Sequence, residues 1–330
     1  MKLSDFRHTL TSCAAAAMLA GCGGSQPPIG APGAMPQTSA VAARAEPGKS
    51  WMLPEAKNED LLYVTNYYTV LVFSYPDGKL VGTLKDFHSA SGACVDGTGN
   101  VFVTNFKPVT VYEYAHGGTK RIASFPTKKA GTFGCAVNPV NGDLAITGQT
   151  SYVEIFRGAR GKPIILQDKG MFFGQFCTYD DKGDLFFDGL QNPKGKPRLS
   201  ELPGGSSKFT GISVNATLDS EAGIEWDGRY LTALSYVTPH AKQSKPVILR
   251  IDIDGTRGTK VGATPLDKPA YSIVQYFITK GTAIVPNLGS PSSGDKEVLF
   301  YKYPRGGAPT MQWTKHITDP RGLLLSAASD

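Results

Sequence analysis

The chain has 330 residues, a formal net charge of +6, and 41% hydrophobic residues. The positive charge is mild and spread through sequence without a basic run, which argues against nucleic acid as a partner. About 280 residues follow the N-terminal region described next, enough for one large core and too many for a single simple sandwich.

Residues 1–21 are typical of an export signal. Lys2 and Arg7 precede a short run of Ala, Met and Leu that is too brief to span a bilayer. The run ends in Leu19-Ala20-Gly21-Cys22, which resembles the lipobox of bacterial lipoproteins. The resemblance implies cleavage before Cys22 and diacylation of its thiol. An ordinary secretory signal followed by a chance cysteine is the alternative.

Residues 22–50 are rich in Pro, Gly, Ala and Ser and have no helix or strand periodicity, so they are expected to form a flexible linker behind the lipid. Several acyl chains on one residue anchor stably, and the expected membrane contact is the lipid alone. The implied location is the bacterial cell envelope. If the host has two membranes, Gly23 after the cysteine resembles lipoproteins sent to the outer membrane, surface-exposed or facing the periplasm.

From residue 51 onward, one pattern recurs six times. Short apolar strands with a common anchor position at Thr65, Thr104, Thr147, Asp188, Ala233 and Pro286 repeat about every 44 residues, a period within the range of propeller blades. Each unit has an apolar run before the anchor, an alternating strand after it, and a Gly-containing turn such as "PDGK" or "HGGTK".

The two ends of the repeat array complement each other. The first unit begins directly with its second strand, "LLYVTN", and the chain finishes with "RGLLLSAASD", which matches a first strand. Pairing the two removes an open sheet edge. The sequence therefore predicts an all-β fold, a six-bladed β-propeller of four-stranded blades over residues 51–330, with Leu323 to Ser326 completing blade one.

"YVTN" at 63–66, "VFVTN" at 101–105 and the Gly-Asp and Gly-Asn turns resemble the YVTN and NHL-type bacterial β-propellers. The resemblance covers about residue 58 to the end. It implies the architecture and says little about function, because that family includes binding proteins, surface proteins and a few enzymes.

Variable loops at one end of such a fold form the candidate ligand-binding rim. These loops combine aromatics with amides and lysines, which suits a glycan, a peptide, a protein or an anionic ligand. The alternative is that the lysines only keep exposed loops soluble while the aromatics pack beneath them. The candidate rim residues are Tyr67, Tyr68, Phe106, Lys107, Gln149, Asn192, Lys128, Lys129, Phe172 and Phe173.

Three functions remain open. The sequence favours a binding or protein-interaction module with an extracytoplasmic ligand. It has no nucleophile elbow, phosphate-binding loop or haem motif, so no cofactor or catalytic residue is expected. A metal-dependent hydrolase of the lactonase type is the alternative, with His88, His316 and Asp319 as metal-ligand candidates. A structural cell-surface protein is the third.

Three cysteines lie in the repeat region, on expected innermost strands. Relative to the turn residues Asp96, Asn138 and Asp180, Cys135 and Cys177 are equivalent, while Cys94 is offset by one and should face the other way. Buried free thiols are expected, with a Cys135–Cys177 disulfide as the alternative.

Overall fold

A computed structural model describes residues 48–191, 195–218, 223–236, 245–268, 273–289 and 294–328. These residues belong to one compact unit, Ala42–Asp330. The signal, Cys22 and most of the 22–50 linker lie outside the described residues. Within the described ranges, no helix has the length and apolar character needed to cross a membrane.

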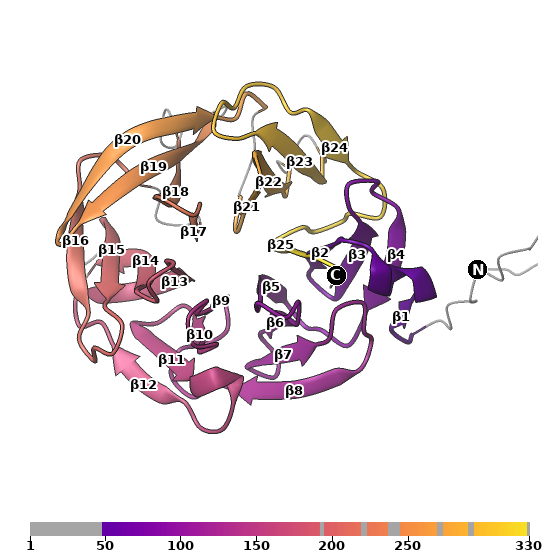
Figure 1. Ribbon diagram of the computed structural model, residues 1–330, viewed down its shortest axis with the longest axis horizontal. Coiled ribbons are helices and arrows are strands. Elements are labelled where there is room, and N and C mark those ends of the chain that lie inside the picture. Colours follow the sequence, from indigo (N-terminus) through magenta and orange to yellow (C-terminus); the bar gives the residue numbers. More distant parts are fainter. Residues whose placement is uncertain are drawn as a thin grey trace, which may run out of the picture. The chain divides into compact units, whose positions relative to one another are not determined.

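The unit is all-β, and its described strands form five sheets, one of which has eight strands and contains a parallel pair. We describe them in chain order as six strand groups, I to VI, by dividing the eight-stranded sheet in two (Figure 1). Group I contains five strands in the spatial order β1-β4-β3-β2-β25, in which the last strand of the chain pairs with β2. A short 3₁₀ segment, Pro54–Asn58, follows β1. The strands of group I are β1 (Trp51–Met52), β2 (Leu61–Asn66), β3 (Thr69–Ser74), β4 (Leu80–Leu84) and β25 (Leu323–Ser326).

Groups II and III are separate four-stranded sheets, each with its strands in chain order. In both groups the first three strands are buried at nearly every position, whereas the outermost strand is largely exposed. A 3₁₀ turn, Arg157–Ala159, precedes the last strand of group III. Group II comprises β5 (Ala90–Val95), β6 (Val101–Asn105), β7 (Thr110–Tyr114) and β8 (Arg121–Pro126); group III comprises β9 (Gly134–Val137), β10 (Leu144–Thr147), β11 (Tyr152–Phe156) and β12 (Ile164–Gln167).

Groups IV and V differ from the expected separate sheets, because their outermost strands pair in parallel and join them into one eight-stranded sheet. Group VI is a separate four-stranded sheet. Group IV comprises β13 (Met171–Tyr179), β14 (Leu185–Gln191), β15 (Pro197–Leu202) and β16 (Thr210–Val214); group V comprises β17 (Ile224–Trp226), β18 (Leu231–Tyr236), β19 (Pro246–Asp254) and β20 (Arg257–Pro265); group VI comprises β21 (Phe277–Thr279), β22 (Thr282–Asn287), β23 (Glu297–Lys302) and β24 (Met311–Trp313).

The first strands of the six groups follow one another in space. β25 neighbours β5, and contacts continue through β9, β13, β17 and β21 back to β25, around a common centre (Figure 1). Backbone hydrogen bonds link these neighbours: the N–H of Gly92 donates to the carbonyl of Phe133 at 2.8 Å, and Gly223 donates to Val274 at 2.8 Å. A Cβ at Gly92 would collide with the Phe133 oxygen, so this approach requires glycine.

The hydrophobic core is divided among the interfaces between neighbouring groups. One cluster, for instance, joins Leu61 and Tyr63 of group I to Val101 and Val103 of group II. Another joins groups VI and I around Phe300. Each group thus has both faces buried, which explains why β2 is buried at every position.

The recurring threonine anchor connects neighbouring groups. The Thr65 hydroxyl donates to the Ser91 carbonyl at 2.6 Å, and the Thr147 hydroxyl donates to the Gln175 carbonyl at 2.7 Å. Each bond runs from a second strand to the first strand of the following group. The threonines of the repeat are therefore structural.

The cysteine expectation is wrong for two of the three residues. Cys94 and Cys135 form a disulfide with a Cα separation of 5.7 Å, and Cys177 is the buried free thiol. Equivalent positions on neighbouring groups face the same way around the centre, so Cys135 and Cys177 cannot meet. Cys94 of group II is offset by one position and faces group III. Cys135 of group III faces group II, so both cysteines lie in the core between groups II and III. A disulfide closing 41 residues contributes about 4 kcal/mol in the chain-entropy account.

Candidate functional site

An aromatic patch forms where the loops of groups I and II meet. We define it as Tyr67, Tyr68, His88 and Phe106, from the β2–β3, β4–β5 and β6–β7 connections. The Tyr67 and Tyr68 ring centroids lie 4.6 Å apart at 81°, and Tyr68 and His88 lie 5.5 Å apart at 79°. The side chains of Tyr68 and Phe106 are 59% and 45% exposed. The patch thus presents large rings to solvent.

The backbone under the patch is held in an unfavourable conformation. Tyr67, Asp86 and Ser89 have φ values of 58°, 67° and 63°, in the left-handed region that favours glycine. A residue other than glycine held in this region lowers the stability of the folded state by about 1–3 kcal/mol, and such residues are frequent at binding and active sites.

Hydrogen bonds fix the strained loops against one another. The N–H of His88 donates to Asn105 Oδ1 at 2.6 Å, the N–H of Phe106 donates to the His88 carbonyl at 3.1 Å, and the N–H of Ala90 donates to the Tyr67 carbonyl at 2.8 Å. The asparagine of "VFVTN" therefore positions His88. The rings are held by a preformed scaffold.

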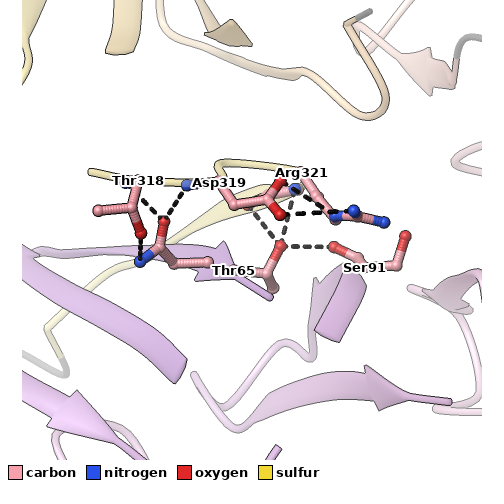
Figure 2. A network of polar contacts seen from close by, with 7 residues as sticks. Thr65, Ser91, Thr318, Asp319 and Arg321 are labelled. Atoms are coloured by element: carbon pink, nitrogen blue, oxygen red, sulfur yellow. Dashed lines mark hydrogen bonds and ion pairs between the residues drawn. The ribbon is translucent and has the colours of Figure 1, made fainter. Parts of the chain in front are cut away.

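Next to the patch, a polar network joins the end of β2 to the C-terminal segment (Figure 2). Asn66 Oδ1 accepts the N–H groups of Thr318 and Asp319 at 2.9 and 2.7 Å, and its Nδ2 donates to the Thr318 hydroxyl at 2.9 Å. The Asn66 amide thus fixes the loop before β25 by accepting its backbone N–H groups, just as Asn105 fixes the loop before β5. The asparagines of both VTN motifs are thus loop anchors.

Arg321 extends the patch with a charged group. Its guanidinium lies 4.5 Å from the Tyr67 ring centroid, and its Nε donates to Asp319 Oδ1 at 3.2 Å. Both side chains are partly exposed. Arg321 was not among the predicted rim residues; the Pro-Arg-Gly sequence before the terminal strand is the signal that could have identified it.

The predicted rim lysines are exposed, and two share a structural anchor. The buried Glu154 of β11 accepts the N–H groups of Lys128 and Lys129 through Oε1, at 2.7 and 2.5 Å. This fixes the loop while its side chains remain in solvent, where the Lys129 ammonium lies 5.6 Å from the Tyr152 ring centroid. Lys107, directly after Phe106, is exposed as well.

The remaining predicted rim residues are dispersed. Gln149 is exposed in the β10–β11 connection, and Phe172, at the start of β13, is 54% exposed with Phe173 partly buried beside it. None of these three joins the ring contacts of the aromatic patch. Asn192 lies outside the described residues.

The three metal-ligand candidates lie in different surroundings. His88 belongs to the aromatic patch, Asp319 pairs with Arg321, and His316 lines a pocket of about 440 Å³ with Lys79 and Trp313. In the part of the chain that the structure describes, no three His, Cys, Asp or Glu side chains gather into a possible metal site.

Glu225, in the middle of β17, has a property that the sequence does not reveal. Glu225 is partly buried, and desolvation by the surrounding protein raises the pKa of its carboxyl group to about 8. Its backbone carbonyl accepts the Thr232 hydroxyl, which in turn bonds the Tyr276 hydroxyl at 2.8 Å. The alternation within β17 places its side chain opposite Ile224 and Trp226, on the face toward group VI.

No family model matches the sequence, and no curated protein matches it significantly.

Proposed function

We propose that residues 51–330 form a six-bladed β-propeller similar to the YVTN and NHL types, with each strand group as one blade. The succession of first strands from β25 through β21 supports the ring, as does the division of the core among six interfaces. Closure by β25 would join the chain ends, which is how propellers protect their edges.

We propose further that the protein is anchored by lipid at Cys22 in the bacterial cell envelope. The support is the "LAGC" sequence together with the Cys94–Cys135 disulfide, since disulfides persist mainly in oxidising, extracytoplasmic compartments.

The proposed activity is binding rather than catalysis. The observation that carries it is the aromatic patch: exposed rings on strained loops that hydrogen bonds hold in place. A preorganised surface loses little entropy on binding, and exposed aromatic rings are frequent anchors in interfaces. The protein would then act as an interaction module whose ligand belongs to the envelope or its surroundings.

The test compares retention of the full-length protein on fractionated bacterial envelope, separated into protein and polysaccharide fractions. Replacing Tyr68 and Phe106 together by serine should weaken retention at least about tenfold, because two exposed anchors are lost. In the matched control, Val140 and Ile165, which are exposed apolar residues outside the patch, are both replaced by serine. This control should bind like the wild type. Equal retention of both double variants would refute the proposed site. Stoichiometric metal in the purified protein would favour the lactonase-type alternative.

The anchor has a separate test. Cys22→Ser should shift the protein from the membrane fraction to the soluble fraction or block its processing, because the acylated thiol is lost. Fractionation followed by mass measurement of the N-terminal peptide reports both. Unchanged partition and processing would contradict the lipid assignment.

A further inference from the structure

We infer that the aromatic patch binds a carboxylated saccharide, an oligomer of uronic acid or similar acidic pyranose units. This inference rests on the proposed binding function and specifies its ligand class. It follows from two properties of the same surface, the orientation of its rings and the charge around them.

The rings suit the faces of pyranose sugars. A pyranose ring carries axial C–H groups, polarised positively, that pack on the negative face of an aromatic ring. Tyr68 stands nearly perpendicular to both Tyr67 and His88, so each ring offers a differently oriented surface. Phe106 is tied to this group through its backbone N–H, which donates to the His88 carbonyl at 3.1 Å. The patch therefore extends beyond one ring, as an oligosaccharide requires.

Basic side chains lie in and next to the patch. Arg321 lies on the Tyr67 ring, and Lys107 follows Phe106. Lys128 and Lys129 are exposed in the next loop of the same kind, and Asp86 and Asp319 are acidic residues in the loops that carry the patch and Arg321. Asp319 holds the guanidinium through Nε and NH2 and leaves part of it exposed. Guanidinium and ammonium groups of this kind recognise carboxylates.

The alternatives fit this surface less well. A neutral saccharide would use the rings and leave the lysines without a role. An apolar peptide would need a groove, and the pockets around Lys79 and around Asn215 are lined by residues outside the patch.

Purified full-length protein is titrated with galacturonate, glucuronate and mannuronate tetramers, each paired with its carboxyl-reduced counterpart. At least one acidic tetramer should bind about tenfold more tightly than its reduced partner, and the difference should shrink in high salt. Tyr68→Ala should weaken binding at least about tenfold and Lys107→Gln about threefold, while Lys162→Gln, an exposed lysine on the β11–β12 turn, should change nothing.

Equal binding of acidic and reduced tetramers would overturn the acidic class, as would failure of every acidic tetramer to bind. Either result leaves the binding function standing if envelope retention still depends on Tyr68 and Phe106. Retention that is indifferent to these residues refutes the binding site itself.

Discussion

A chain that ends at residue 319 is expected to aggregate or to melt far below the full-length protein. The deletion removes β25, whose residues Leu323 and Leu324 are 0% and 1% exposed. Leu323 belongs to the core between groups VI and I, and Leu324 to the core between groups I and II. The deletion also exposes the edge of β2, which β25 pairs along Leu61 to Val64.

The expected loss is large because truncating one buried leucine costs about 2–5 kcal/mol, against a typical total stability of about 5–15 kcal/mol. Thermal melting followed by circular dichroism measures it. Leu324→Ala provides a milder variant that should still fold and melt lower. As the control, deleting residues 23–46 should leave the melting temperature nearly unchanged. If the 1–319 chain is soluble and melts like the full-length protein, β25 does not close group I.

Replacing Glu225 by glutamine is expected to stabilise the protein at alkaline pH. Burial raises the pKa of this carboxyl from 4.5 to about 8, so the folded state favours the protonated form. In the wild type, stability is fully present below about pH 4.5 and falls as the pH rises toward 8, because over this range the unfolded state releases the proton that the folded state keeps. The shift in pKa corresponds to a loss of about 3–5 kcal/mol in the free energy of unfolding between pH 4.5 and pH 8.

Urea unfolding at several pH values measures this dependence. Wild-type stability should fall between pH 5 and pH 9 more steeply than that of Glu225→Gln, and the two proteins should differ most at pH 9. Asp181→Asn, which removes an exposed carboxyl, is the control and should follow the wild type. Parallel curves for Glu225→Gln and the wild type would show that Glu225 does not titrate in this range.

The strand pattern could be predicted because it repeats locally. The threonines at 65, 104 and 147 mark the same position in successive groups. The hydroxyls of Thr65 and Thr147 bond the first strand of the following group, and that of Thr104 bonds Gly92 in the first strand of its own group. The terminal strand could also be predicted, since "LLLS" at 323–326 supplies what the first unit lacks, and it pairs where expected. Both inferences depend on period-two alternation and on turn residues, which are visible within a few positions of sequence.

Features that depend on neighbours distant in sequence could not be predicted. The sequence shows that Cys94 is offset by one residue from the equivalent cysteines. Only the packing of groups II and III shows that this offset brings Cys94 into contact with Cys135. The parallel pairing of β16 with β20 depends on how two outer edges converge. The stacking of Arg321 on Tyr67 joins residues 254 positions apart, and no local pattern encodes it.

The central claim is that ligand binding occurs on the aromatic patch and the loops beside it. Hydrogen exchange of the full-length protein, free and bound to the envelope fraction that retains it, tests this claim most directly. We expect slower exchange of backbone amides in segments 66–69, 86–89, 105–109 and 317–321, with the turns at 97–100 and 139–143, at the other ends of their strands, unchanged. Protection at those turns without protection at the patch would contradict the account.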